Sequence, residues 1–287
     1  MQELPAGVAL TAIAMAQERR LETERTDGLV HDTLAEIFVD QALASTAGTA
    51  LSWMNDGLSL GDFCPAMGDF VALRTRYMDD RLLALVRRAA VRQVVIPAAG
   101  LDCRAYRLPW PAEADVFEID FPAVIEFKQR ALATADQVPS SRRTAIPADL
   151  RGDWTEALLH GGFDIHQPAI WVIEGLLMYL SGADAERLLH NVNAVAAPGS
   201  HLMADHAYPA ALRNAAFALG RQTLDGNGSA FRTTIADPVG WLDGHGWSAG
   251  VAKPADLVSE HDRELPPVLD PRRPDAPIFW LATATKR

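Results

Sequence analysis

The chain has 287 residues, of which 49% are hydrophobic and 22% are charged, and its formal net charge is −11 at pH 7. A globular α/β protein has this composition, and the acidic balance with scattered Lys and Arg argues against nucleic acid as a partner. The chain has only two cysteines and no basic leader. Its longest apolar stretch, at 168–180, is too short to cross a bilayer, so we expect a soluble, cytoplasmic protein.

The first 90 residues are predicted to form a helical cover. Their apolar residues recur at the spacing of an amphipathic helix in two places. The first set comprises Val30, Leu34, Ile37 and Phe38, and the second comprises Leu82, Leu83 and Val86 after an acidic helix start at Asp79-Asp80. Between the two sets, 57–68 contains Gly, Pro and Asn and is predicted to be a loop.

From residue 91 to residue 207, short apolar runs alternate with helical segments, which is the pattern of a mostly parallel sheet covered on both faces. The predicted strands are 93–96, 116–119, 144–146, 169–173 and 201–204. One predicted helix follows Pro122, and another spans 181–197 and ends at Pro198-Gly199. We expect this core to belong to a single domain that spans 1–287.

Residues 208–235 interrupt the alternation. Within them, 209–224 is predicted to be a helical insertion that ends at Asp225-Gly226-Asn227-Gly228, and we expect it to form part of a lid. The remaining segment, 236–287, is expected to complete the sheet, with a helix at 238–245 and a closing strand at 278–284.

Polar residues stand at the carboxyl ends of the first four predicted strands, where open parallel sheets bind their ligands. The first strand leads into Ala98-Ala99-Gly100-Leu101-Asp102, and the next three end near Asp120, Asp149 and Glu174. The small residues let a ligand approach the backbone, and Asp120, twenty residues after Gly100, is placed to bind ribose hydroxyls. Because the loop lacks the G-x-G-x-x-G and G-x-x-x-x-G-K-[ST] motifs, 91–207 is predicted to bind a nucleoside cofactor without phosphates.

These residues also have structural interpretations. Glu174 lies in an apolar run, so its carboxylate needs a partner: either a ligand cation, such as a sulfonium or ammonium group, or an internal Arg. Asp149 could instead cap a helix that begins near Asp153 or belong to a turn after Pro147, and Arg74 could be a surface helix residue. The eight histidines show no metal-ligand spacing, so no metal is predicted.

Five motifs in order carry a resemblance to a known family. They are Arg74-Thr75-Arg76 with Asp79-Asp80, Ala99-Gly100-Leu101-Asp102-Cys103-Arg104-Ala105-Tyr106-Arg107-Leu108, Phe117-Glu118-Ile119-Asp120-Phe121-Pro122, Ala148-Asp149-Leu150 and Glu174-Gly175-Leu176-Leu177-Met178-Tyr179-Leu180. Together they resemble the leucine carboxyl methyltransferase family, most closely its bacterial branch, which includes polyketide carboxyl methyltransferases. The resemblance implies S-adenosyl-L-methionine as cofactor and a Rossmann-like class I methyltransferase fold with a seven-stranded sheet.

The resemblance also implies roles for individual residues. At the methionine end of the cofactor, Arg74, assisted by Arg19, is expected to bind the carboxylate, and Glu174 is expected to make a further contact. Asp120 is expected to bind the ribose, and Asp149 with the Leu150 backbone the adenine. Ala98 and Gly100 are the expected contacts in the loop. Tyr179 is expected to face the acceptor. The chain departs from the family at Ala98, where Gly is usual and a methyl group is added beside the cofactor, and at Cys103, where Thr or Ser is usual.

Methyl transfer from a sulfonium is an in-line displacement that needs alignment and exclusion of water rather than a metal. A carboxylate acceptor is already ionised and needs only orientation. Tyr179, together with either Arg74 or Arg232, is the candidate for orienting it. A phenol must lose a proton, and His206 after Asp205 is the candidate base. We therefore expect an O-methyltransferase for a small-molecule carboxylate, on a polyketide or other secondary metabolite. Hydroxyl methylation and a noncatalytic cofactor-binding protein are the alternatives.

Overall fold

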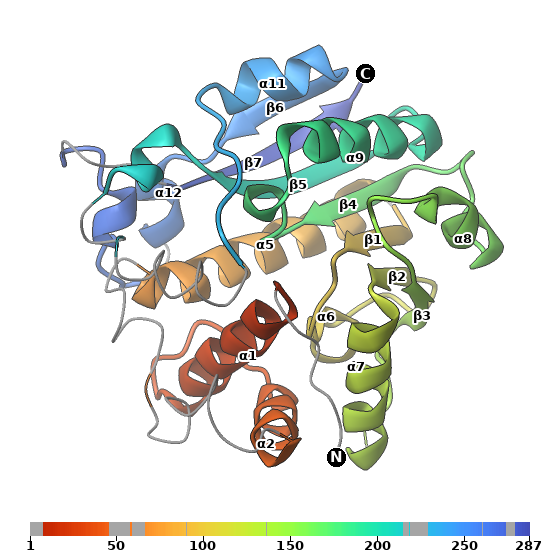
Figure 1. The fold of residues 1–287 in the computed structure, drawn as a ribbon, viewed down its shortest axis with the longest axis horizontal. Helices are drawn as coiled ribbons and strands as arrows, with labels where there is room; N and C mark the ends of the chain where they lie inside the picture. Colours follow the sequence, from red (N-terminus) through yellow and green to blue (C-terminus); the bar gives the residue numbers. More distant parts are fainter. Residues whose placement is uncertain are drawn as a thin grey trace.

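The computed structural model describes residues 8–45, 58, 67–89, 91–135, 137–214, 218, 229–259, 261–273 and 279–287. At its centre is a seven-stranded sheet with the order β3-β2-β1-β4-β5-β7-β6 (Figure 1). The strands are β1 Gln93–Pro97, β2 Asp115–Asp120, β3 Arg142–Pro147, β4 Ala169–Ile173, β5 His201–Ala207, β6 Trp247–Val251 and β7 Phe279–Lys286. Strands β1 to β5 pair in parallel, and β7 is antiparallel to β5 and β6. The predicted seven-stranded, mostly parallel α/β fold is confirmed.

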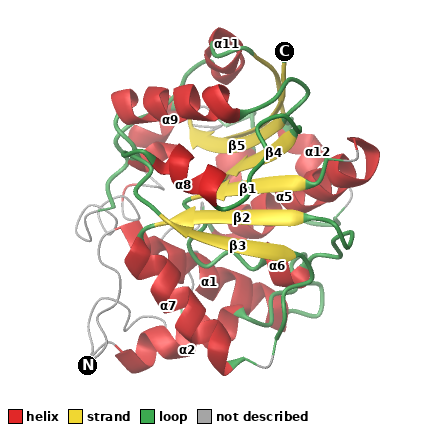
Figure 2. Cartoon of the chain, turned by 90° about the vertical axis from the view of Figure 1, so that its right-hand side faces the viewer, coloured by secondary structure: helices red, strands yellow, loops and turns green. Residues whose placement is uncertain are grey.

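Helices lie on both sides of the sheet (Figure 2). The described helices are α1 Val8–Glu24, α2 Ala35–Ser45, α5 Gly68–Ala89, α6 Arg104–Arg107, α7 Pro122–Thr134, α8 Trp154–His160, α9 Gly182–Val195, α11 Pro238–Gly244 and α12 Pro254–Val258. Three single 3-10 turns are η1 Leu177–Tyr179, η2 Pro209–Leu212 and η3 Pro267–Leu269. No described helix is long and apolar enough to cross a membrane.

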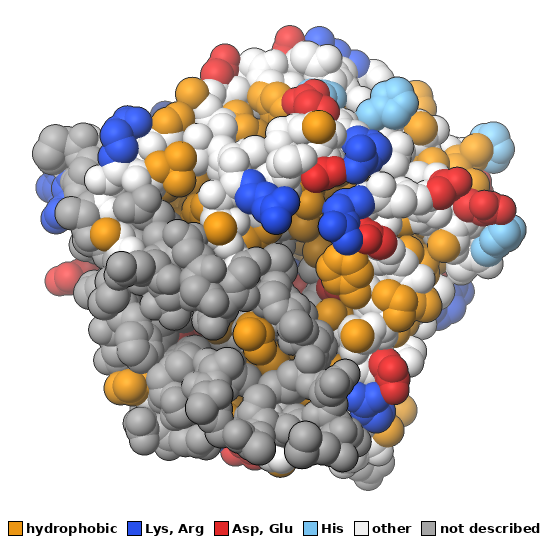
Figure 3. Space-filling view, in the orientation of Figure 1, with side chains coloured by type: hydrophobic (Ala, Val, Ile, Leu, Met, Phe, Trp, Pro, Cys, Tyr) orange, Lys and Arg blue, Asp and Glu red, His pale blue; other side chains and the backbone are white. Residues whose placement is uncertain are grey.

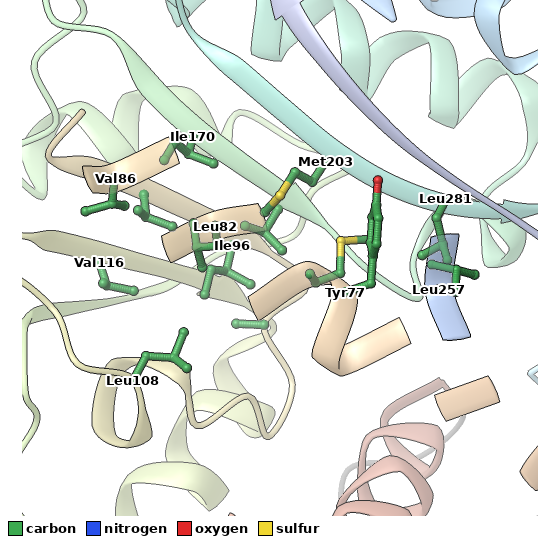
Figure 4. Close-up of a cluster of buried hydrophobic side chains, with 14 of the residues drawn as sticks. Tyr77, Leu82, Val86, Ile96, Leu108, Val116, Ile170, Met203, Leu257 and Leu281 are labelled. Atoms are coloured by element: carbon green, nitrogen blue, oxygen red, sulfur yellow. The ribbon is translucent and has the colours of Figure 1, made fainter. Parts of the chain in front are cut away.

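The inner strands are buried on both faces, which explains their continuous apolar runs. Successive side chains of β1 point to opposite faces and join two different hydrophobic clusters. Ile96 lies in the cluster that Leu82 and Val86 of α5 cover (Figure 4). Val95 lies in the cluster on the other face, with Trp154 of α8 and residues of α9. The strand ends are therefore held rigidly between two layers of helices.

The predicted helical cover is formed by α1, α2 and α5: α1 packs on both α2 and α5, and α2 packs on α7 (Figure 1). Two details differ from the expected pattern. Val30 lies before helix α2, which begins at Ala35 after a turn in which Asp32 accepts hydrogen bonds from the N–H groups of Leu34 and Ala35. Helix α5 begins at Gly68, so Asp79-Asp80 lies within the helix, where Arg104 and Arg107 neutralise Asp79.

The C-terminal half differs from the prediction in two places. Strand β6 was not predicted, because Ser248, Ala249 and Gly250 form no β-branched run and the strand lies at the sheet edge. In the predicted helical insertion, the turn η2 is described, but 215–217 and 219–228 lie outside the described residues. The described segment 229–235 is not helical and leads back toward the carboxyl end of β5.

Candidate active site

A cavity of about 260 Å³ opens at the carboxyl ends of the parallel strands. The loops after β1, β2, β3 and β4 all line it, so the four polar strand ends singled out in the sequence meet at one place. Helix α1 contributes Thr11, Ala12, Met15 and Arg19 from the cover, and the segment after the insertion contributes Ala230 and Arg232. The location is the one that an open parallel sheet favours for ligands.

The loop after β1 makes a tight turn into the cavity. Ala98 and Gly100 both have left-handed backbone conformations, with φ of 53° and 48°. A Cβ atom on Gly100 would lie 3.0 Å from the Cβ of Ala12, so helix α1 packs directly on this glycine. Two features therefore require glycine at position 100: its left-handed φ and the close approach of α1.

Replacing Ala98 by glycine is expected to stabilise the protein. A left-handed alanine costs about 1–2 kcal/mol, which exceeds the roughly 0.5–1 kcal/mol of chain entropy that glycine loses. Ala98→Gly should therefore raise the melting temperature by roughly 1–2 °C. The matched control is Ala99→Gly, because Ala99 is outside the left-handed region and should lose stability. An unchanged or lower melting temperature for Ala98→Gly would contradict this account of the turn.

Asp120 closes this turn from the end of β2. Its Oδ2 accepts a 2.6 Å hydrogen bond from the Gly100 N–H, and its Oδ1 accepts one of 2.7 Å from the Phe121 N–H. Burial raises the pKa of Asp120 above its usual value, against these two N–H groups, which lower it. Each carboxylate oxygen can accept a second hydrogen bond, and Asp120 lines the cavity, so both oxygens can also serve a ligand diol.

Asp149 and Leu150 line the cavity after β3. Asp149 does not cap α8, whose N-cap is Asp153; it pairs with Arg151 at 2.6 Å, and that hydrogen bond lowers its pKa. Arg151 also lies over the ring of Phe121, 5.8 Å from its centroid. Arg151 and Phe121, which the sequence did not single out, therefore border the cavity beside Asp149.

Glu174 has internal partners, so its burial does not by itself indicate a ligand cation. Its Oε1 lies 2.9 Å from Nε of Arg74, and its Oε2 accepts a 2.6 Å hydrogen bond from Arg104. Although burial opposes ionisation, Arg104 and Arg74 hold the pKa of Glu174 below its usual value. The internal arginine considered from the sequence as a partner of Glu174 is therefore present, in the form of both Arg74 and Arg104.

Arg74 is not a surface residue, because it is only 6% exposed. Besides Glu174, it donates a 3.0 Å hydrogen bond to Asp205 at the end of β5. Asp205 also accepts a 2.6 Å hydrogen bond from the Gly175 N–H, where φ is 63°. The cavity therefore presents an arginine whose charge is already balanced by two carboxylates.

Arg104 is the centre of a buried ion-pair network that the sequence did not reveal. It is 2% exposed, and its three guanidinium nitrogens contact Asp79, Asp102 and Glu174. Arg107 adds a second pair to Asp79. Since Asp102 and Glu174 line the cavity, Arg104 connects α5 to two of its walls.

Arg19 lines the cavity, and two of its guanidinium nitrogens donate within the protein. Its Nη2 donates to the Leu101 carbonyl at 2.7 Å, and its Nε donates to Asp32 at 2.8 Å. These bonds fix α1 to the loop after β1. The neighbouring Cys103 is a buried free thiol packed among apolar residues, and burial raises its pKa well above the usual value.

The two residues considered for catalysis lie in different places. Tyr179 lines the cavity, packs edge-on against Phe231, and has a pKa raised by burial to about 12. His206 is fully buried in β5 and is not among the residues that line the cavity. Its Nδ1 accepts from the Ala207 N–H, its Nε2 lies 3.2 Å from the Thr233 hydroxyl, and burial lowers its pKa to about 4. The structure therefore does not bring His206 together with the other predicted residues.

Comparisons with known proteins all match this chain to methyltransferases. The model of the leucine carboxyl methyltransferase family matches residues 12–193. A protein from a Parafrankia species, named as an S-adenosyl-L-methionine-dependent methyltransferase, is 40% identical over 265 residues, covering 91% of this chain and 83% of its own. One of the same name from Streptomyces coelicolor is 40% identical over 273 residues, covering 90% and 87%. A solved structure described as a methyltransferase from Thermobifida fusca has a TM-score of 0.58 at 17% identity, covering 98% and 95%, a likeness of fold.

Proposed function

Since this chain belongs to the leucine carboxyl methyltransferase family and is an S-adenosyl-L-methionine-dependent methyltransferase, we propose that it methylates a carboxylate oxygen of a small molecule. The acceptor we propose is a polyketide or another secondary metabolite, on the resemblance to the bacterial branch of the family. We propose neither nucleic acid nor a membrane as a partner of the protein.

The donor set of the cavity fits the cofactor. Among the described lining residues, five carboxylates face four guanidinium groups, and S-adenosyl-L-methionine carries one net positive charge. Asp120 has acceptor capacity for the ribose hydroxyls, and Asp149 with Leu150 would hold the adenine. Arg74 and Glu174 would hold the methionine end. When bound, the cofactor supplies an electrophilic methyl group: the acceptor oxygen forms a C–O bond while the C–S bond breaks and sulfur keeps the electron pair.

The observation that carries the carboxylate proposal is the set of titratable groups in the cavity. No histidine, lysine or cysteine lines it within the described part of the chain, and each of the five lining carboxylates is held by an arginine or, for Asp120, by two backbone N–H groups. Tyr179, with its pKa raised to about 12, stays protonated at neutral pH, so its hydroxyl can donate a hydrogen bond but is not a base. A carboxylate acceptor needs no proton removed, only orientation by such a donor.

Replacing His206 by alanine tests the choice between carboxylate and hydroxyl transfer. His206 is uncharged at neutral pH and outside the cavity lining, so we expect His206→Ala to keep most of the rate of methyl transfer. The rate should be measured at a temperature where the melting curve shows the variant folded, because the substitution leaves a buried space. A collapse of the rate in the folded variant would favour a hydroxyl acceptor with His206 as base.

The noncatalytic alternative rests on Ala98, which adds a methyl group where the family usually has glycine. The turn accommodates Ala98 at φ 53°, and Asp120 still receives the Gly100 N–H. The alternative is distinguished by its outcome: S-adenosyl-L-methionine would bind, but no acid would be methylated.

A further inference from the structure

Four arginines line the described part of the cavity, and three of them are paired within the protein. Arg19 pairs with Asp32, Arg151 with Asp149, and Arg74 with both Glu174 and Asp205. Arg232 makes no ion pair with any described residue, and its side chain is exposed. The cation available to an added anion is therefore Arg232, whereas each of the other three already faces a carboxylate.

The backbone that carries Arg232 is fixed beside Tyr179. The Arg232 N–H donates a 2.7 Å hydrogen bond to the Met178 carbonyl in η1. The next side chain, Thr233, has its hydroxyl 3.1 Å from the Leu177 carbonyl and 3.2 Å from the Leu180 carbonyl. These hydrogen bonds attach the segment to the turn that also holds Tyr179. The side chains of Arg232 and Tyr179 therefore reach the cavity from adjoining segments.

The preceding residue holds this segment from the other side. Phe231 packs edge-on against Tyr179, with ring centroids 5.5 Å apart, and against Phe279 of β7. With one neighbour packed inward and the other hydrogen-bonded to η1, the Arg232 side chain is directed to the cavity rim. Figure 3 shows Lys and Arg side chains just above the middle of the drawn face, with Asp and Glu side chains among them.

We infer that Arg232 binds the carboxylate of the acceptor and makes the enzyme selective for acids. This rests on the proposed carboxyl methylation and identifies which guanidinium performs the orientation. A guanidinium and a carboxylate form two parallel hydrogen bonds, which fix the plane of the acceptor group. The phenol of Tyr179 lies on the same side of the cavity and can donate a further hydrogen bond to it.

The test compares Arg232→Met and Arg232→Lys with the control Arg187→Met. Arg187 is an exposed arginine that does not line the cavity, although its partner Asp184 does, so its removal takes one positive charge from beside the cavity without removing a lining cation. Two quantities are measured for each protein: the dissociation constant of S-adenosyl-L-methionine by calorimetry, and the formation of S-adenosylhomocysteine with a panel of small carboxylic acids.

We expect Arg232→Met to lower kcat/KM for acids by roughly 10- to 100-fold, since a hydrogen bond to a charged group contributes about 1.5–3 kcal/mol. Its affinity for the cofactor should stay within about twofold of native, a change of less than 0.5 kcal/mol. Arg232→Lys should recover part of the loss by lowering KM, and Arg187→Met should behave like the native protein.

Four results would overturn the inference. Native rates on acids in Arg232→Met would do so while leaving the proposed function intact. Equal losses in Arg232→Met and Arg187→Met would reduce the effect to general rim charge. A tenfold loss of cofactor affinity in Arg232→Met would assign Arg232 to the cofactor instead. If the native enzyme binds S-adenosyl-L-methionine but methylates no acid, the proposed function fails and the inference fails with it.

Discussion

Asp120→Asn is expected to weaken the binding of S-adenosyl-L-methionine by roughly a hundredfold, or about 3 kcal/mol. The substitution removes the charge that would accept the ribose hydroxyls. It also places an amide N–H₂ against either the Gly100 N–H or the Phe121 N–H, both of which now donate to the carboxylate. The turn after β1 and the ribose site should therefore be lost together.

Calorimetric titration with S-adenosyl-L-methionine measures this effect, and Asp115→Asn is its matched control. Asp115 begins the same strand, β2, and pairs with exposed Arg142 away from the cavity. The control should bind within about twofold of native, a change of less than 0.5 kcal/mol. Equal affinities of native and Asp120→Asn would remove Asp120 from the cofactor site.

Arg104→Met is expected to lower the free energy of unfolding by about 3–5 kcal/mol, the cost of leaving buried carboxylates without their partner. Asp102, Asp79 and Glu174 would all lose a guanidinium contact at once. Domains are stable by only about 5–15 kcal/mol, so this loss should be visible as a large shift of the urea midpoint. Arg142→Met, which breaks the exposed pair with Asp115, should leave the urea midpoint nearly unchanged, because an exposed ion pair is screened by solvent.

The difference between native and Arg104→Met should also depend on pH. Burial opposes the ionisation of Asp102, but Arg104 is the strongest of the charges that lower its pKa to about 2 from the usual 3.8. A lowered carboxyl pKa gives stability that is complete above the unfolded pKa and is lost as the pH falls through the folded one. The difference should therefore shrink between about pH 4 and pH 2. A difference independent of pH would indicate lost packing rather than lost charge.

The sheet could be predicted from sequence because each inner strand is a short, continuous apolar run. Strand β4, Ala169–Ile173, was predicted to the residue, since a buried apolar run ends there at Glu174. Parallel pairing then places Asp120, Asp149 and Glu174 at one edge, and all three line the cavity. Strand β6 gave no such signal, because an edge strand that is half exposed needs no apolar run.

The partners of the polar residues could not be predicted in the same way. Arg104 meets Asp79 across 25 positions of chain and Glu174 across 70. Nothing in local periodicity encodes such contacts, which depend on how α5 packs against the sheet. His206 shows a second limit: its place at a strand end made it the candidate base for a hydroxyl acceptor, but its side chain lies 3.2 Å from the Thr233 hydroxyl and is not among the residues that line the cavity.

The most direct test of carboxyl methylation is the chemical stability of the transferred group. Native protein is incubated with methyl-labelled S-adenosyl-L-methionine and a panel of small acids, and the products are treated with mild alkali. A carboxyl methyl ester releases its label as volatile methanol, whereas a methyl ether keeps it. We expect transferred label that alkali releases. Alkali-stable label would contradict carboxyl transfer, and cofactor binding without any transfer would contradict catalysis itself.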